Sequence, residues 1–357
     1  MANRMDHPLF FERNRVRRVY TGGKLFHEFF GDEPEDGDLP EEWIASAVRA
    51  LNRESASDHE GVSLLRGTRT RFDEVLVSRR EDLLGDCAEF GILVKVLDSA
   101  IRLPIQAHPT KDYARRHFGS PHGKTEMWVV LATRPGASIY YGLKEGVTLA
   151  VLKEAVDRAE EDREALPSLL NRLPARPGDV YLIPAGVAHA IGAGCLILEV
   201  QEPTDFTIQP EPWCGDYHLN ADEMYIGLEP DIALTCFDFT QRVGKRAIDE
   251  GRKTPKILSE NSTLCSELLV GPADTPDFSV YRHSVQSGSF TLPRRPAVFV
   301  VTAGAGEVIG EEGSTAVRKG SYFFLPAASR HASVTTDSKI EIVECIPPCV
   351  SDPSYSH

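Results

Sequence analysis

The chain has 357 residues and a formal net charge of −14 at pH 7. Its length is enough for two or three domains of ordinary size. The negative charge argues against broad contact with nucleic acid or an anionic membrane, and no apolar stretch is long enough to span a bilayer. Residues 1–18 alternate charged and apolar side chains, so we expect no signal peptide.

The seven cysteines are an odd number and are scattered along the chain. This pattern favours unpaired thiols in a reducing compartment and predicts a cytoplasmic location. Cys345 and Cys349 flank a Pro-Pro pair, but the other cysteines lack the paired spacing of a metal site. We therefore interpret the cysteines as structural.

The first candidates for chemistry follow an acidic loop expected at residues 35–42. Gln106 and His108 lie two positions apart in an apolar segment that ends at Pro109. A strand would point both side chains the same way, so the amide oxygen and the imidazole could bind one ion. The alternative for His108 is a satisfied core histidine before a turn. Residues 110–118 read as a short helix, whose basic residues we interpret as a solvated surface.

Glu126 and His189 also lie among apolar residues, where an unpaired charge would be costly. Together with Gln106 and His108 they offer two imidazoles, a carboxylate and an amide oxygen. That set suits one zinc or another borderline divalent ion per chain. Taken alone, Glu126 could equally be an edge-strand carboxylate.

Two further side chains are candidates for catalysis. Lys124 is two positions from Glu126 and could donate a hydrogen bond to a substrate, although an exposed edge-strand lysine would look the same. Glu199 follows an apolar run at residues 196–198 and is a candidate proton acceptor or a strand-edge residue. Between them, residues 148–173 have apolar residues at helical spacing and predict a helical insertion.

A repeat organises the chain. Residues 176–189 align without a gap on residues 318–331, with Arg, Gly, Pro, Ala and His in register. The second copy lacks ligands, since Ala297 falls where Glu126 would be, and His331 is therefore interpreted as structural. The hairpin pattern predicts a mainly β protein of two jelly-roll barrels, with the helical insertion in the first. The expected domains are residues 1–245, which are catalytic, and residues 246–357, which carry no metal ligands.

Several motifs resemble one known family. They are Tyr-Thr-Gly-Gly-Lys at 20–24, Glu-Trp-Ile-Ala-Ser at 42–46, Leu-Val-Lys-Val-Leu-Asp at 93–98, Gln-Ala-His-Pro at 106–109, Lys-Thr-Glu-Met-Trp at 124–128, Pro-Ala-Gly-Val-Ala-His-Ala-Ile-Gly at 184–192 and Glu-Val-Gln-Glu-Pro-Thr-Asp at 199–205. Across most of its length the chain is similar to type I mannose-6-phosphate isomerases, zinc enzymes built from cupin-type jelly rolls. The resemblance implies that the zinc ligands are Gln106, His108, Glu126 and His189. It also implies that Lys124 is an active-site cation and that Glu199 or Asp205 faces the substrate.

The chain departs from the family pattern at two positions. Gln209 stands where the family usually has an arginine near the sugar, and Pro104 stands where many members have a serine at the phosphate end of the pocket. A neutral amide does not replace a bidentate arginine fork. We therefore expect weak turnover of mannose 6-phosphate unless another cation takes the place of the arginine, and the candidates for it are Lys95, Lys111 and Arg115.

Interconversion of an aldose and a ketose moves a proton between adjacent carbons through a cis-enediolate, whose charge a divalent ion can stabilise. The sequence therefore predicts a cytoplasmic, metal-dependent isomerase of mannose 6-phosphate and fructose 6-phosphate, with a small sugar or sugar phosphate as its partner. One alternative is an isomerase or epimerase of another sugar, including an unphosphorylated one. The other is a non-catalytic, metal-containing sugar-binding regulator.

Overall fold

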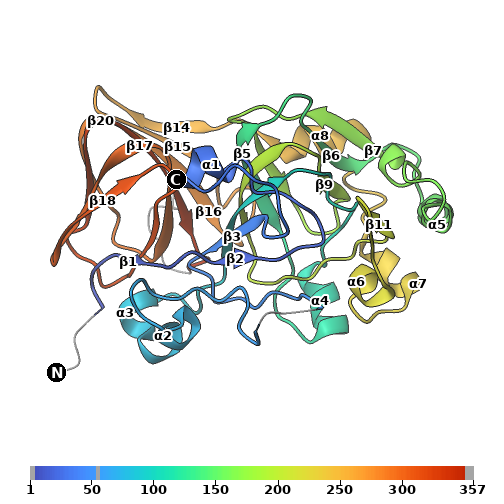
Figure 1. Cartoon of the computed structure of the whole chain (residues 1–357), viewed down its shortest axis with the longest axis horizontal. Helices are drawn as coiled ribbons and strands as arrows, with labels where there is room; N and C mark the ends of the chain where they lie inside the picture. The colour runs from blue at the N-terminus through green and yellow to red at the C-terminus, as the bar shows by residue number, and fades with distance from the viewer. Residues whose placement is uncertain (1–4, 54–56, 350–357) are drawn as a thin grey trace.

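The structure is a computed structural model that describes residues 5–53 and 57–349. It is mainly β, as predicted, and two large antiparallel sheets carry most of the strands (Figure 1). In spatial order the seven-stranded sheet contains β13 (Arg252–Lys253), β8 (Val180–Ile183), β5 (Glu126–Thr133), β10 (Cys195–Gln201), β4 (Leu93–Ser99), β3 (Glu41–Ile44) and β2 (Arg15–Val16).

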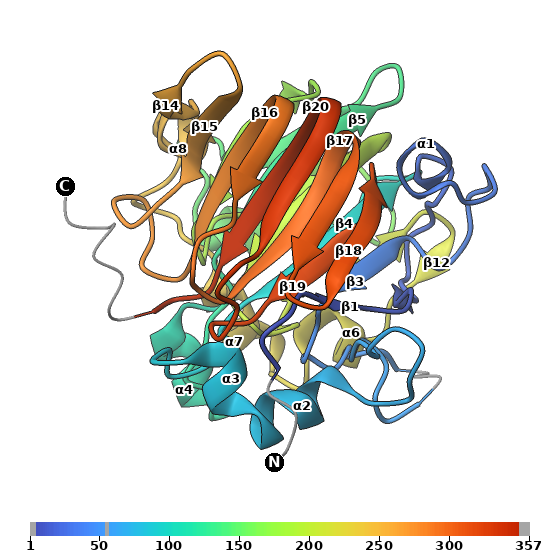
Figure 2. The same cartoon turned by 90° about the vertical axis from the view of Figure 1, so that its left-hand side faces the viewer.

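The eight-stranded sheet is built mainly from the C-terminal part of the chain. Its strands run side by side in Figure 2. They are β1 (Leu9–Phe10), β19 (Tyr322–Leu325), β17 (Ala297–Gly310), β20 (Ser333–Ile346), β16 (Ser279–Thr291), β15 (Leu264–Val270) and β14 (Lys256–Glu260), with β18 (Gly313–Arg318) paired to β17. Because β1 pairs with β19, the N-terminal segment contributes to both large sheets.

Smaller elements cover the ends of these sheets. One three-stranded sheet contains β7 (Leu170–Pro174), β6 (Ser138–Leu143) and β9 (His189–Ile191), and a hairpin joins β11 (Trp213–Cys214) to β12 (Tyr217–His218). The helices are α1 (Phe26–Phe30), α2 (Phe72–Ser78), α3 (Arg80–Leu84), α4 (Lys111–Phe118), α5 (Leu149–Arg158), α6 (Ala221–Tyr225), α7 (Pro230–Ala233) and α8 (Gly244–Gly251), with short 3-10 turns at Pro167–Leu169 and Leu234–Cys236. None of the helices in the described part of the chain has the length and apolar character that crossing a bilayer requires.

Strand β10 has one face in the hydrophobic core and the other face turned away from it. All of its residues are buried, so the strand is covered on both faces. Leu196, Leu198 and Val200 pack in a cluster that also contains Val298 and Val343 of the other large sheet. Since neighbouring residues of a strand point to opposite faces, Glu199 points away from that core.

The predicted repeat is confirmed by strand register. In the first copy Glu126 of β5 pairs with Ile183 of β8, and in the second Ala297 of β17 pairs with Leu325 of β19. Ile183 and Leu325 are equivalent in the sequence alignment, so Ala297 does occupy the place of Glu126.

Several local predictions need correction. The acidic loop expected at residues 35–42 ends before Glu41, because Glu41 and Glu42 are buried in β3 and paired with β4. The helical insertion contains α5, but its last residues form β7, paired with β6. The boundary predicted between residues 245 and 246 falls inside α8, and the chain passes from one large sheet to the other between Lys253 and Lys256.

The expectation that every cysteine is unpaired is wrong. Cys87 and Cys349 form a disulfide across 262 residues of sequence, with their Cα atoms 4.7 Å apart. The pairing removes the argument for a reducing compartment that rested on free thiols. Cys195, Cys214, Cys236, Cys265 and Cys345 are free.

The disulfide makes a countable prediction. Denatured but unreduced protein should expose the five free thiols, and reduction should raise the number to the seven cysteines of the chain. Cys87→Ser should release Cys349 and expose six thiols without reduction, the five plus Cys349. Thiol titration in denaturant measures all three numbers, and seven thiols before reduction would contradict the pairing.

Candidate active site

Three buried side chains form a group able to hold a metal ion. His108, Glu126 and His189 place one ligand atom each within 4.8 Å of one another. The two carboxylate oxygens of Glu126 divide between the imidazoles, with Oε2 3.1 Å from Nε2 of His108 and Oε1 3.2 Å from Nε2 of His189. These are three of the four metal ligands predicted from the sequence.

The backbone brings these side chains together from separate segments. Glu126 is the first residue of β5 and His189 the first of β9. Gln106 and His189 exchange two backbone hydrogen bonds of 2.9 Å, which set Gln106 beside the group. The strand expected around Gln106 and His108 is only an isolated bridge at Gln106 and Ala107, and His108 lies just beyond it.

Hydrogen bonds fix the orientation of both imidazoles. Nδ1 of His108 lies 3.0 Å from the Phe206 carbonyl, and Nδ1 of His189 lies 2.8 Å from the Val187 carbonyl. A carbonyl only accepts, so each Nδ1 carries a proton and each Nε2 is the nitrogen that faces Glu126. Burial, reinforced by Lys124, lowers the pKa of His108 to about 3, which keeps that ring neutral.

The carboxylate completes a donor set that fits a cation. Oε1 of Glu126 is buried and accepts no hydrogen bond from the described residues. It lies 3.2 Å from Nε2 of His189, so a carboxylate oxygen and a ring nitrogen face the same buried point. A bound cation would take both as ligands. Burial alone would raise the pKa of Glu126, but Lys124, His108 and His189 hold it well below its usual range.

Lys124 supplies positive charge at the same place. Its buried Nζ lies 2.7 Å from Nε2 of His108 and 2.6 Å from Oε2 of Glu126. Gln106 is also adjacent, with its amide nitrogen 3.3 Å from Nε2 of His189.

A cavity of about 860 Å³ opens beside this group. Seven residues that the sequence analysis singled out line it: Lys95, Pro104, Gln106, Lys124, Glu199, Asp205 and Gln209. Lys111 and Arg115 are not in the lining, because Lys111 pairs with Glu202 and Asp277 and Arg115 with Asp112. The expectation that either of them replaces the missing arginine is therefore wrong.

Glu199 is buried in the cavity wall and held from two neighbouring strands. Nε1 of Trp128 donates to its Oε2 over 3.1 Å, and Nζ of Lys95 lies 3.3 Å from its Oε1. Both contacts follow from register, since Glu199 pairs with Trp128 of β5 and Lys95 of β4. Burial first, then the charge of Glu126, raises the pKa of Glu199. A carboxyl with a raised pKa beside a cavity is suited to accept and return a proton.

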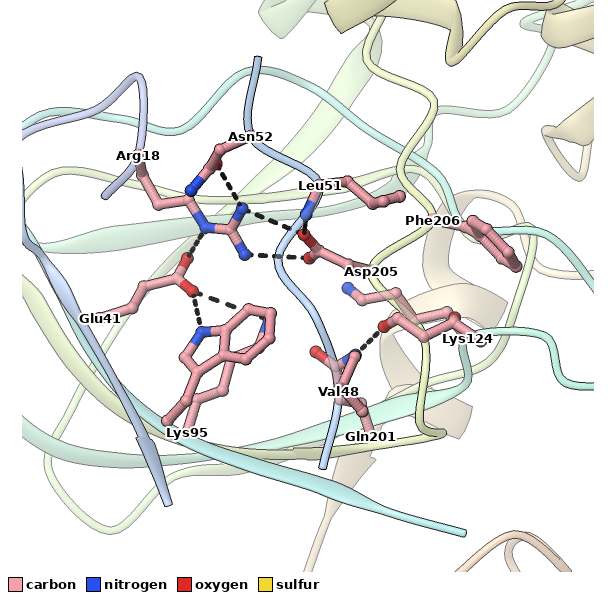
Figure 3. Close-up of polar contacts among 12 residues, drawn as sticks. Arg18, Glu41, Val48, Leu51, Asn52, Lys95, Lys124, Gln201, Asp205 and Phe206 are labelled. Atoms are coloured by element: carbon pink, nitrogen blue, oxygen red, sulfur yellow. Dashed lines mark hydrogen bonds and ion pairs between the residues drawn. The ribbon is translucent and has the colours of Figure 1, made fainter. Parts of the chain in front are cut away.

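Sequence reasoning missed Arg18 and Glu41, which complete this wall. Figure 3 shows the Arg18 guanidinium between the carboxylates of Glu41 and Asp205. Two of its nitrogens donate to Asp205 over 3.0 and 3.1 Å, and its Nε lies 3.1 Å from Glu41. Asp205 also accepts from the Leu51 backbone over 2.9 Å. Asp205 is thus committed to positioning Arg18 and the adjacent loop.

Glu41 carries its own buried network. It accepts hydrogen bonds from Tyr20 over 2.7 Å and from Trp43 over 2.6 Å, and it lies 3.8 Å from Nζ of Lys95. Burial would raise the pKa of Glu41, yet Arg18 and Lys95 lower it to about 2. The available sequence signal was the motif at residues 42–46, which begins one residue after Glu41. Glu41 itself fell in the acidic loop expected at residues 35–42. No motif marked Arg18.

Gln209 lies on the cavity wall. Its side chain donates to the Glu223 carbonyl over 2.8 Å and its backbone nitrogen donates to the Met224 carbonyl over 2.9 Å. The amide therefore fastens the loop to α6 and offers no positive charge to the cavity.

Comparison with known proteins identifies the family. Residues 272–345 match the family model described as mannose-6-phosphate isomerase, cupin domain. The chain is 38% identical to the mannose-6-phosphate isomerase ManA of Bacillus subtilis over 241 residues, which is 66% of this chain and 69% of that protein. It is 29% identical to a mannose-6-phosphate isomerase of Streptococcus mutans over 95% of this chain and 98% of that one.

Solved structures share the fold. The mannose 6-phosphate isomerase structure from Bacillus subtilis superimposes with a TM-score of 0.73 at 21% identity, over 94% of this chain and 99% of that one. A mannose 6-phosphate isomerase bound with zinc and yttrium superimposes with a TM-score of 0.68 at 16% identity, over 95% and 99% of the two chains. With the sequence match to ManA, these findings show that the chain belongs to the type I mannose-6-phosphate isomerase family of the cupin superfamily.

Proposed function

We propose that this protein is a metal-dependent isomerase that interconverts mannose 6-phosphate and fructose 6-phosphate through a cis-enediolate. The observation that carries the proposal is a buried His108, Glu126 and His189 group beside a large cavity whose wall holds Glu199, a carboxyl of raised pKa. The relatives named as mannose-6-phosphate isomerases support the substrate.

The metal is proposed to be one zinc ion per chain. His108, Glu126 and His189 would hold it, and a structural neighbour whose title names zinc supports the choice. Gln106 is the proposed fourth ligand, because half a turn of its amide would direct the oxygen toward the group. When bound, the ion supplies Lewis acidity that stabilises negative charge on the sugar oxygens.

The proton transfer is assigned to Glu199. Lys95 and Trp128 fix its two oxygens, so the carboxylate keeps one orientation while a proton moves between neighbouring sugar carbons. Lys124 lines the cavity and would donate a hydrogen bond to a sugar oxygen. Asp205, which the resemblance to the family offers as a residue facing the substrate, is given a positioning role because Arg18 and Leu51 occupy both of its oxygens.

Arg18 is proposed to supply the positive charge of the family arginine, whose position Gln209 occupies in this chain. Its guanidinium lines the cavity and is bound to Asp205, four positions before Gln209. Lys95, the remaining candidate from the sequence, lies in the same wall beside Glu199. Lys95 from β4 and Arg18 from the segment after β2 thus both bring positive charge to this wall of the cavity.

The phosphate group is assigned to the cavity mouth near Arg53. Arg17 also lines the cavity, but it pairs with Asp38. Within residues 5–53 and 57–349 Arg53 has no carboxylate partner, so its guanidinium is available to an anion. An unphosphorylated sugar remains the alternative substrate, because Pro104 and Gln209 both line the cavity.

The finer account of the architecture is also proposed. We infer a cupin-type jelly roll around each large sheet and a division into a catalytic part and a C-terminal part, supported by the repeat register and the cupin family match. A cytoplasmic location and the absence of nucleic-acid and membrane partners stay predictions from the sequence.

The metal assignment can be tested by ligand removal. His108→Ala and His189→Ala should each bind far less than one zinc per chain by elemental analysis while keeping a cooperative melt, since the ligands come from separate segments. His331→Ala is the matched control: His331 is exposed and belongs to the ligand-poor repeat, so its metal content should equal the parent's. Full occupancy in both ligand variants, or metal loss in the control alone, would refute the site.

The role of Glu199 can be tested by an isosteric change. Glu199→Gln should lower kcat for mannose 6-phosphate on the order of 10²–10⁴-fold, the usual contribution of a general base, with zinc content unchanged. The parent should lose kcat/KM as pH falls through the raised pKa of Glu199, because protonation removes the base. Glu344→Gln is a control, since Glu344 pairs with Phe299 as Glu199 pairs with Trp128 but lies in the other repeat. Undiminished turnover in Glu199→Gln would overturn the assignment.

The substrate can be tested through Arg18. Arg18→Ala should reduce kcat/KM for mannose 6-phosphate on the order of 10²–10³-fold, the usual cost of removing one charge-stabilising donor. Gln209→Arg should partly restore it. Assays of the parent with mannose 6-phosphate, free mannose and pentoses, read as ketose formed, decide the sugar. Arg246→Ala, on the exposed face of α8, should change nothing. Equal rates with free mannose would favour the unphosphorylated alternative.

A further inference from the structure

A second cavity lies between the N-terminal segment and the eight-stranded sheet. It has a volume of about 230 Å³ and is lined by residues 11–13, Phe30, Arg66 and residues 318–322. The pairing of β1 with β19 brings these segments together, and α1 closes the cavity where the Phe29 carbonyl approaches Gly320. Figure 2 shows β1, β18 and β19 on one side of the molecule.

The lining of this cavity carries positive charge, opposite in sign to the net charge of the chain. Arg13, Arg66, Arg318 and Lys319 line it against one carboxylate, Glu12, although the whole chain carries −14. Glu12 accepts a hydrogen bond from the Gly67 backbone over 2.6 Å. In the part of the chain that the structure describes, none of the four cations forms an ion pair with a carboxylate. By contrast, the nearby Arg15 pairs with Asp32 and Glu42.

Aromatic rings and a backbone carbonyl hold three of the cations instead. The guanidinium carbon of Arg13 lies 4.2 Å from the ring centre of Phe30, and one of its nitrogens is 3.5 Å from the Phe30 carbonyl. Arg66 lies 4.7 Å from the ring of Phe10, and Lys319 lies 5.8 Å from that of Phe29. A ring face positions a cation without neutralising it, so the N–H donors stay available to a ligand.

From this geometry we propose that the cavity is a binding site for a phosphate-type oxyanion, either free or as the phosphate end of a small metabolite. Arginine forks match the geometry of phosphate oxygens. The volume is below the roughly 300–1,000 Å³ of pockets for larger ligands, which suits a phosphate-sized group. The proposal does not depend on the isomerase function.

Strand β3 separates this site from the substrate cavity. Tyr322, in the lining, donates to Glu42, whose oxygens also accept from Asn14 over 3.0 Å and contact Arg15 at 2.9 Å. The next residue toward the N-terminus, Glu41, lines the substrate cavity. Adjacent strand residues point to opposite faces, so the two cavities lie on opposite sides of β3.

The test is a binding measurement on the full chain loaded with zinc. Inorganic phosphate, pyrophosphate and fructose 6-phosphate are titrated calorimetrically at 150 mM NaCl, where non-specific attraction between surface charges is screened. Because the substrate cavity also takes phosphate groups, two double variants separate the sites. Arg66→Gln with Arg318→Gln removes exposed cations of the new site, and Arg17→Gln with Arg53→Gln removes those of the substrate cavity.

The expected result is at least a tenfold loss of affinity for pyrophosphate or phosphate at one class of sites in the first double variant, with KM for mannose 6-phosphate unchanged. The second double variant should raise KM for mannose 6-phosphate and leave the affinity at that class of sites unchanged. Lys256→Gln with Arg330→Gln, which removes the same charge from exposed positions elsewhere, should bind as the parent does.

Two results would overturn the proposal: binding in the Arg66 and Arg318 variant equal to the parent's, or an equal loss in the Lys256 and Arg330 control. Tighter binding of fructose 6-phosphate than of phosphate at this class would identify a metabolite as the source of the anion. Tighter binding of the inorganic anions would identify the free ion, and either preference supports the site. If the isomerase assignment fails, the KM comparison is lost, but the calorimetric affinities of the parent, the Arg66 and Arg318 variant and the control still decide the proposal, because they are measured without turnover.

Discussion

The buried charges around Glu199 are the constraint on which the site depends. A charge inside a protein must be paired, because losing one partner leaves the other uncompensated at a cost of about 3–5 kcal/mol. Lys95 forms ion pairs with Glu199 and Glu41, and Arg18 forms ion pairs with Glu41 and Asp205. Four segments of the chain are fixed by these pairs. With Lys124 and Glu126 added, the buried set has one more carboxylate than cation when all are ionised. That excess is consistent with the raised pKa of Glu199 and suits a divalent ion.

The repeat shows how the same strand plan serves two purposes. Glu344 occupies the register of Glu199, but the side chains around it differ. His283 lies 3.0 Å from its Oε2 and Arg295 lies 3.1 Å from its Oε1, where the first copy has Lys95 and Trp128. Arg295 and His283 lower the pKa of Glu344, although burial alone would raise it, whereas the pKa of Glu199 is raised. The paired Glu344 is suited to holding strands together, whereas Glu199, whose pKa is raised by burial and then by the charge of Glu126, is suited to proton transfer.

What the sequence could predict was local. The metal-binding group followed from two histidines and a glutamate in apolar surroundings, and the repeat followed from an ungapped alignment that the register of Ala297 bears out. Glu199 was recognisable because it follows an apolar run. Arg18 was not, since its partner Asp205 is 187 residues away and ion pairs leave no periodic pattern. The Cys87–Cys349 disulfide was missed for the same reason, its cysteines being 262 residues apart.

The position of Arg18 also changes how the loss of an arginine at Gln209 should be interpreted. A sequence motif locates a charged residue by its position in the chain. A cavity needs only a charged group at the right place in space, whichever segment supplies it. Arg18 reaches that cavity from the segment after β2, and Asp205 holds it with two hydrogen bonds. Gln209 itself donates to the Glu223 carbonyl and fastens the loop to α6. A family departure at one residue is therefore evidence against the family's chemistry only after every segment that reaches the cavity has been considered.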